Sequence, residues 1–143
     1  SRVSLVVSQP LVACLPQSHP LARASSVGLD QLRGEPLVVV SRTVSPDYHA
    51  RILSECEQAG WLPPAVHELR HWLSVVSLVS QGLGVALVPQ ALQKSALAGV
   101  AFVPLAQADV RYDTRCLWRS GRDQMALKDF VQAVQGGVQS LVS

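Results

Sequence analysis

Residues 73–89 read LSVVSLVSQGLGVALVP, and this stretch decides the fold. Its first half predicts a helix, because apolar residues recur at the three- and four-residue spacing of one helical face. We expect that face to comprise Leu73, Val76, Leu78, Val79 and Ser80. Gly82 and Gly84 end the helix, since glycine adopts the left-handed conformation that closes a helix C-terminus. Residues 85–88 then read as a short buried strand.

The order of these parts argues against a nucleotide-binding loop. In a dinucleotide fingerprint a strand leads into the glycines, and the glycines open a helix onto a pyrophosphate. Here a helix leads into the glycines and a strand follows, and the third glycine of the fingerprint is absent. The glycines are therefore predicted to serve the backbone and not a phosphate.

Composition and charge fit an ordinary globular domain, or part of one. The chain has 143 residues, of which 48% are hydrophobic, so it can bury a sizeable core. Only 5% are aromatic, and the abundance of Val, Leu and Ala favours an α/β layer architecture. The formal net charge is +2 and no segment concentrates Lys and Arg. Nucleic-acid binding needs such clusters, so we expect no direct contact with DNA.

Cysteine usage and the lack of long apolar runs predict a cytoplasmic protein without a membrane partner. Cys14, Cys56 and Cys116 are widely spaced among apolar neighbours, which is typical of free buried thiols in a reducing compartment. A redox role stays open for Cys116 alone, because Arg115 beside it could activate the thiol. No signal peptide opens the sequence, and no apolar run reaches the roughly 20 residues of a membrane helix.

Strands and helices alternate along the chain. Strands are predicted at residues 11–15, 37–40, 66–69, 101–105 and 112–119, and helices at 29–33, 46–59, 91–98 and 124–135. The residues at the start of the helix at 46–59 favour a helix N-terminus, with Ser45 as cap, Pro46 at the first position and Asp47 near the positive end of the helix dipole. We expect its buried face to comprise Ile52, Leu53 and Cys56. The alternation predicts a mainly parallel sheet with right-handed crossovers.

Residues 67–71 read HELRH, which matches the zinc-protease motif letter for letter. That chemistry needs both histidines on one helical face and a further ligand downstream. The prolines at 63 and 64 and the β-like residues after them favour a strand instead, which would hold His67 and His71 too far apart to chelate one ion. No histidine or glutamate follows His71. We therefore predict no metal site.

Other catalytic arrangements have no support in the sequence. No serine lies in a G-x-S-x-G elbow, so Ser-His-Asp hydrolysis is not indicated. His19 and His49 stand alone in polar surroundings and need no role beyond that of surface or loop residues. We predict a protein with no catalytic residue and no cofactor, and therefore not an enzyme.

Three further motifs precede the stretch at 73–89. They are HPLA at 19–22, LDQL at 29–32, and GEP at 34–36 before the apolar run 37–40. In this order, and with the element from Gln81 to Pro89, the chain resembles the effector-binding domain of LysR-type transcriptional regulators. The resemblance covers residues from about 11 to 134. It is carried by many turn and packing signatures and by no catalytic motif.

The resemblance implies an α/β, periplasmic-binding-protein-like (type 2) fold of two subdomains with the ligand site between them. Residues 1–36 would be the end of the first subdomain and the crossover into the second, and 37–105 the second subdomain. Residues 106–143 would be the return crossover and the C-terminal helix of the first. The second subdomain is then complete and the first partial, since its opening units have no counterpart in the chain.

The loop before residue 46 is the best binding candidate. Its hydroxyls, one guanidinium and the free amides of a helix start follow a buried strand, where open α/β sheets accept ligands. From the residues alone, Ser45 could equally be only a cap and Arg42 only solvated. The resemblance favours binding and implies an effector site of Ser41, Arg42, Thr43, Ser45, Pro46, Asp47, Tyr48, His71 and Trp72. For Trp72 a buried position is the alternative.

The resemblance implies an effector sensor that controls transcription through a helix-turn-helix domain outside this chain, which alone would contact DNA. The expected partners are a small-molecule effector, for which the loop chemistry favours an anion, and other copies of the chain in a dimer or tetramer. Two alternatives stay open. One is a periplasmic-type solute-binding protein, which shares the two-lobed architecture, and the other is a zinc hydrolase, which rests only on HELRH.

Overall fold

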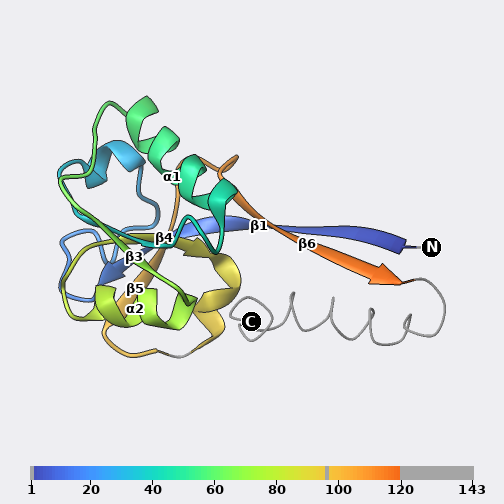
Figure 1. Ribbon diagram of the computed structural model, residues 1–143. Coiled ribbons are helices and arrows are strands. Elements are labelled where there is room, and N and C mark those ends of the chain that lie inside the picture. The colour runs from blue at the N-terminus through green and yellow to red at the C-terminus, as the bar shows by residue number, and fades with distance from the viewer. Residues whose placement is uncertain (1, 96, 120–143) are drawn as a thin grey trace.

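The computed structural model describes residues 2–95 and 97–119, with side chains from residue 4 to 114 apart from 96 (Figure 1). The helix predicted at 124–135 and the side chain of Cys116 lie outside this part. In chain order the elements are β1 (Arg2–Pro16), the 3-10 turn η1 (Leu29–Leu32), β2 (Leu37–Val40), α1 (Pro46–Gln58), β3 (Val66–Leu69), α2 (Trp72–Ser80), β4 (Ala86–Pro89), the 3-10 turn η2 (Gln90–Ser95), β5 (Val100–Pro104) and β6 (Arg111–Arg119).

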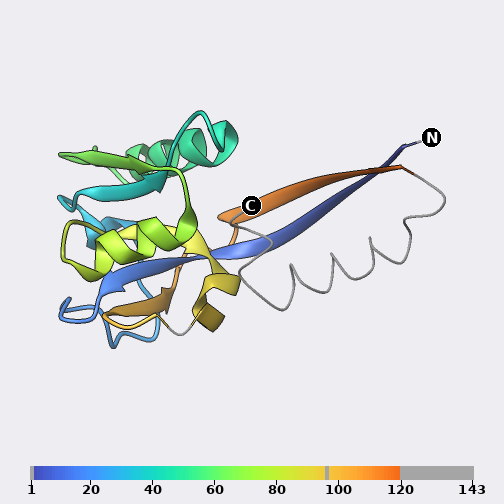
Figure 2. The ribbon, with the colours of Figure 1, turned by 60° about the horizontal axis from the view of Figure 1, so that its bottom comes forward.

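Strand β1 organises the molecule because it changes partners along its length. In its C-terminal part, residues 11–14 lie antiparallel to β4 and residues 12–16 lie antiparallel to β5, whereas residues 2–10 pair with β6 alone. Figures 1 and 2 show β1 and β6 running out together, as a two-stranded ribbon, from the rest of the fold. Residues 11–15 are at most 3% exposed, while the part before them alternates between half-buried and exposed. The predicted strand therefore covered only the fully apolar half of β1.

The sheet is less parallel than the sequence predicted. Strands β2 and β3 are parallel, and the bridge from Leu37 to Val85 sets the start of β4 parallel to β2. Around β1, however, β4, β5 and β6 are all antiparallel. The prediction of a mainly parallel sheet was wrong for the described residues, because β1 enters from the ribbon against the direction of the strands that flank it.

The two α-helices lie on opposite sides of the strands (Figure 1). Helix α2 buries Trp72, Val75, Val76 and Val79. The predicted face was therefore partly wrong, since Leu73 is 42% exposed and Leu78 only half-buried. The helix begins at Trp72, and the large indole sets the buried face at positions 1, 4, 5 and 8 of the helix. Gly82 follows at φ 82°, with its amide bonded to the Val79 carbonyl, as predicted for the end of this helix.

Helix α1 buries Tyr48, His49, Ile52 and Cys56, with Leu53 only half-buried. Ser45 is the N-cap residue, but its hydroxyl makes no capping bond, so the predicted serine cap was wrong. Its backbone carbonyl accepts the His49 amide at 3.0 Å. The helix ends at Gln58, one residue before the predicted end at 59, and Gly60 follows at φ 93°. Its last turn is also tied to the opposite loop, because Arg33 Nη1 donates to the Gly60 carbonyl at 2.9 Å.

Two histidines predicted to be ordinary surface residues have defined partners. His19 Nδ1 accepts the Leu21 amide at 3.0 Å, and its Nε2 meets the Glu35 carboxylate, which joins the HPLA turn to the segment before β2. His49 is 8% exposed, and its Nε2 lies 3.4 Å from Glu68 Oε1. That expectation was therefore wrong for His49, which is buried on α1 beside Glu68 of β3, whereas His19 does lie in a loop and is half-buried.

None of the helices within the described residues combines the length and apolar character that crossing a membrane requires. The two α-helices are short elements of a layered fold, and their buried apolar residues pack against the strands.

Gly84 is required by a close approach of two backbones. A Cβ added there would lie 2.6 Å from the Pro36 carbonyl oxygen and 3.2 Å from Val38 Cγ2. This contact surrounds two bonds that join β4 to β2, from the Val85 amide to Pro36 and from the Val38 amide to Val85, at 2.9 and 2.8 Å. The backbone carbonyl cannot swing away as a flexible side chain could, so any side chain here must push the strands apart.

We predict that Gly84→Ala destabilises the fold more than Gly82→Ala does. A Cβ on Gly82 meets nothing within 4 Å, so its cost is the left-handed conformation alone, about 1–2 kcal/mol. Gly84→Ala adds an overpacking cost of about 1–3 kcal/mol. Urea unfolding of the two variants measures the difference. Equal losses would show that the contact with Pro36 is not what demands glycine at position 84.

Two buried thiols link stability to alkaline pH. Burial raises the pKa of the Cys14 thiol from 9.0 to about 12. Burial, and then the charge of Glu55, raises the pKa of the Cys56 thiol from 9.0 to about 11. Because both values are raised by folding, this contribution to stability is complete below pH 9 and is lost as the pH rises toward 11 and 12.

We predict that the free energy of unfolding falls by about 2–3 kcal/mol between pH 8 and pH 10, as the unfolded chain ionises both thiols. Denaturant titrations at closely spaced pH values measure this slope. Replacing both residues, Cys14→Ala with Cys56→Ala, should flatten the slope whatever it does to stability at pH 8. An unchanged slope in the double variant would assign the alkaline loss to other groups.

Candidate functional site

A groove of about 420 Å³ opens where α1 begins and the β1–β6 ribbon leaves the sheet. Its walls come from three segments far apart in the sequence: the N-terminal half of β1, the start of α1 with the loop before it, and the start of β6. The lining residues are Val6, Val44, Ser45, Pro46, Asp47, Tyr48, Arg51, Arg111, Tyr112 and Asp113. The groove therefore exists only where these three segments meet.

The predicted effector residues fall into two groups. Ser45, Pro46, Asp47 and Tyr48 line the groove together. The other five, Ser41, Arg42, Thr43, His71 and Trp72, do not line it. His71 is exposed at the N-cap of α2, and Trp72 is 2% exposed in the core. The structure thus gathers the helix-start half of the predicted site and leaves the remainder outside the groove.

The first part of the loop is occupied by its own hydrogen bonds. Ser41 and Thr43 share a bond between their hydroxyls at 3.0 Å, and the Ser41 carbonyl accepts the amides of Val44 and Ser45. The Arg42 amide donates to Glu68 Oε1 on β3 at 3.1 Å. These bonds fold the loop into a tight turn, which delivers Ser45 and the helix start to the groove.

The first turn of α1, which lines the groove, carries backbone donors that have no partner inside the helix. Pro46 has no amide hydrogen, and the His49 amide makes the bond to the Ser45 carbonyl. The amides of Asp47 and Tyr48 precede that bond and belong to the first turn, whose donors have no acceptor inside a helix. Because the Ser45 hydroxyl does not cap them, these amides stay available at the positive end of the helix dipole.

An aromatic cluster of Tyr48, Trp72 and Tyr112 supports one side of the groove. The three rings meet edge to face, with centroid separations of 4.9, 5.5 and 5.8 Å. The Tyr48 hydroxyl donates to the Leu87 carbonyl of β4 at 2.6 Å, and burial raises its pKa well above the usual range. Through this cluster, α1, α2 and β6 pack as one unit.

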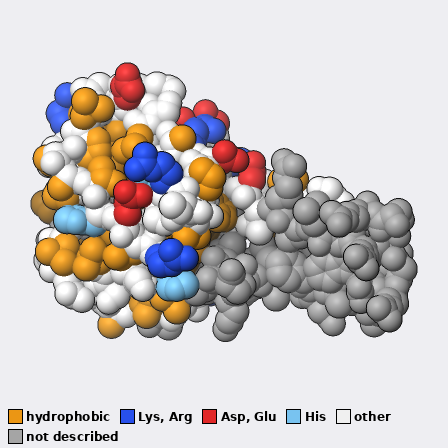
Figure 3. Space-filling model, viewed as in Figure 1, with side chains coloured by type: hydrophobic (Ala, Val, Ile, Leu, Met, Phe, Trp, Pro, Cys, Tyr) orange, Lys and Arg blue, Asp and Glu red, His pale blue; other side chains and the backbone are white. Residues whose placement is uncertain are grey.

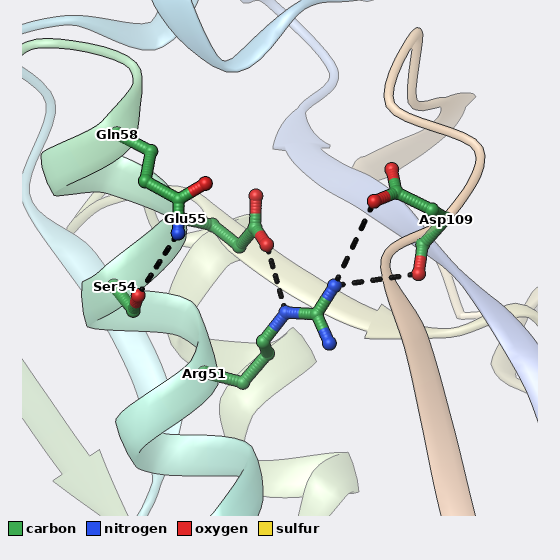
Figure 4. A network of polar contacts seen from close by, with 5 residues as sticks. All are labelled: Arg51, Ser54, Glu55, Gln58 and Asp109. Carbon is green, nitrogen blue, oxygen red and sulfur yellow. Dashed lines mark hydrogen bonds and ion pairs between the residues drawn. The ribbon is translucent and has the colours of Figure 1, made fainter.

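Arg51 joins α1 to the segment that leads into β6 (Figure 4). Its Nε donates to Glu55 Oε1 at 2.7 Å, one helical turn away, and its Nη2 donates to the Asp109 carbonyl at 3.4 Å. The Asp109 carboxylate lies 4.0 Å from the same Nη2. Because the Arg51 and Asp109 side chains are 43% and 83% exposed, the pair orients the guanidinium and adds little stability.

Arg111 stands on the opposite wall and is held by β1. Its Nε donates to Ser8 Oγ at 2.9 Å, and its Nη2 donates to the Ser8 carbonyl at 3.2 Å. Two bonds from one guanidinium to one residue fix both its position and its plane. Arg111 therefore lines the groove in a defined orientation.

Reasoning from the sequence missed Arg51, Arg111, Tyr112 and Asp113 as groove residues. A signal existed for Arg51, which lies four residues after Asp47 and so on the same helical face. No signal existed for the residues of β6, because only the pairing of β6 with β1 brings them to the start of α1.

The HELRH segment behaves as predicted in its local structure. Val66–Leu69 is a strand, so His67 lies on β3 and His71 beyond its end, and the two do not share a helical face. Glu68 is engaged with the Arg42 amide and with His49. Within residues 4–95 and 97–114, whose side chains are described, no group of three or more His, Cys, Asp and Glu side chains is placed to hold a metal ion.

Comparison with known proteins identifies the family. The model of the LysR substrate binding domain matches residues 2–139. The transcriptional regulator AlsR of Bacillus subtilis is 30% identical over 124 residues, which are 87% of this chain and 41% of AlsR. The regulator IlvR of Caulobacter vibrioides is 36% identical over 121 residues, 85% of this chain and 39% of IlvR. The chain thus spans about two fifths of the length of these two transcriptional regulators.

Solved structures show the same fold. The BenM effector binding domain with its effector benzoate superposes with a TM-score of 0.71 at 21% identity, covering 94% of this chain and 65% of that one. Full-length BenM gives a TM-score of 0.70 at 21% identity, covering 95% and 48%. These neighbours have the periplasmic-binding-protein-like type 2 architecture expected from the sequence. The chain belongs to the LysR substrate-binding domain family, whose members are parts of transcriptional regulators.

Proposed function

We propose that this chain senses a small-molecule effector in the groove between the start of α1 and the β1–β6 ribbon, and that it controls a DNA-binding domain outside this chain. One observation carries the proposal. The groove is lined by the start of a helix and by the two strands that run out of this lobe, so a ligand there contacts both. Family membership supplies the class of function, and the groove supplies the place.

The arrangement supports control by population shift. A ligand can change a conformational equilibrium only by binding one state better than another. Here the ribbon residues Val6, Arg111, Tyr112 and Asp113 face helix residues across the groove, so any change in the angle of the ribbon alters the shape of the site. An effector that prefers one angle therefore biases the orientation of whatever the ribbon carries, which is the coupling that a sensor needs.

The proposed division of the chain follows the family pattern. Residues 1–36 would close the first subdomain and cross into the second, 37–105 would form the second, and 106–143 would return to the first. The pairing of strand β1 supports this division, since its first half lies in the ribbon and its second half is the central strand between β4 and β5.

The proposed partners are an effector, other copies of the chain in a dimer or tetramer, and DNA through a helix-turn-helix domain outside this chain. A cytoplasmic location would suit such a regulator. Figure 3 shows cationic, anionic and hydrophobic side chains interspersed on one face of the described residues. This face does not offer the clustered cations that phosphate binding needs, which is consistent with a DNA contact made by another domain.

We predict that Ser45→Ala weakens effector binding about tenfold, the effect of losing one hydrogen bond to a charged or strongly polar group. The Ser45 hydroxyl makes no capping bond, so the helix should keep its stability. Calorimetric titration of the complete regulator, with a metabolite that raises its melting temperature in a screen, measures the loss.

Thr43→Ala is the matched control, because Thr43 carries a hydroxyl in the same loop but does not line the groove. We expect this variant to bind like the wild type. A loss in Thr43→Ala with none in Ser45→Ala would move the site to the outer face of the loop. Normal binding by both variants would show that the hydroxyls of this loop take no part in the site.

A further inference from the structure

The groove holds two arginines, and their charges are used differently. Arg51 is already paired with Glu55 at 2.7 Å and lies near Asp109. Arg111 makes its hydrogen bonds to Ser8, a neutral residue. Among the described residues, no carboxylate comes within 4.0 Å of the Arg111 guanidinium. Arg111 is therefore the cation of the groove that, among the described residues, has no ion-pair partner within 4.0 Å.

The attachment of Arg111 to Ser8 also prepares it for a ligand. Nε and Nη2 each donate to Ser8, which leaves Nη1 with its two hydrogens and the second hydrogen of Nη2 for another acceptor. A guanidinium fixed in advance loses less freedom on binding than a mobile one. Because β6 pairs with β1 at this point, with Pro10 opposite Arg111, the charge is anchored on the ribbon itself.

The other residues that line the groove indicate which kind of ligand body it accepts. Val6 and Val44 are 49% and 46% exposed, which is high for large hydrophobic residues, and both face the groove with Pro46 and Tyr112. An apolar ligand body would cover them. Asp47 and Asp113 also line the groove, and they oppose a second negative charge on the ligand.

We propose that Arg111 is the anion anchor of this groove, that Ser8 is its positioning residue, and that the ligand is a small monocarboxylate with an apolar body. This inference rests on the proposed function of the groove. It adds the class of ligand and the residue that binds its carboxylate. It also transfers the expected anion contact from Arg42, which lies outside the groove, to a residue of the return strand.

The test compares acids with their uncharged amides. The complete regulator is titrated by calorimetry with matched probes: benzoate and benzamide, phenylacetate and phenylacetamide, and hexanoate and hexanamide. We expect one or more of the acids to bind at least tenfold more tightly than its amide. Arg111→Met should remove this preference by weakening the acid and leaving the amide unchanged, a pattern that a general structural defect would not give. Ser8→Ala removes one of the two bonds and should reduce the preference in part.

One further arginine serves as the control. Arg42→Met removes an exposed arginine outside the groove, so this variant should keep the preference for the acid. Preference retained in Arg111→Met, or lost in Arg42→Met, overturns the assignment of Arg111. The ligand class is wrong, while the proposed function stands, if the amides bind as well as the acids. The same conclusion follows if the only metabolite that binds in a screen is multiply charged or polar and its binding is weakened by Ser45→Ala. If neither the probes nor any screened metabolite binds, the proposed function fails and this inference with it.

Discussion

Strand β1 pairs with β4 and β5 on its two edges at residues 12–14, and with β6 alone at residues 2–10. The rest of the structure depends on this change of partners. The buried half must be apolar throughout, because neighbours cover both its edges and both its faces, and residues 11–15 are accordingly almost inaccessible. The outer half has one partner and alternates between half-buried and exposed residues. One strand thus belongs both to a packed core and to a connection that leaves it.

The groove is a consequence of that change. Where the ribbon separates from the sheet, the start of α1 lies against it, and the cluster of Tyr48, Trp72 and Tyr112 fixes the distance between them. The Tyr48 hydroxyl adds a bond to β4, so the helix cannot tilt without disturbing the sheet. The polar residues then lie around a firm aromatic support: Arg51 held by Glu55 on the helix, and Arg111 held by Ser8 on the ribbon. A ligand between these residues contacts both the helix and the ribbon through side chains that are already oriented.

Local features of this chain were predictable because local chemistry fixes them. The strand at 37–40, the strand at 66–69 and the helix that begins at Pro46 lie where the sequence placed them. The buried face of α2 was assigned partly wrongly, since in an almost entirely apolar segment periodicity does not choose between neighbouring faces, and Trp72 made the choice. The capping role of Ser45 failed because a hydroxyl near a helix start has other options, and its conformation depends on the turn made by Ser41.

The sequence by itself determined the family, the sites of most strands and helices, and the part of the candidate site contributed by the start of α1. It could do so because glycine positions, a proline at a helix start and apolar runs act over a few residues. Only the tertiary structure decided that β1 is flanked by antiparallel strands, that His49 is buried beside Glu68, and that Arg111 faces the helix start. Each of these joins residues far apart in the chain, and Ser8 and Arg111 become neighbours only through the pairing of β1 with β6. No local preference encodes such a pairing, because it is settled by the packing of the whole lobe.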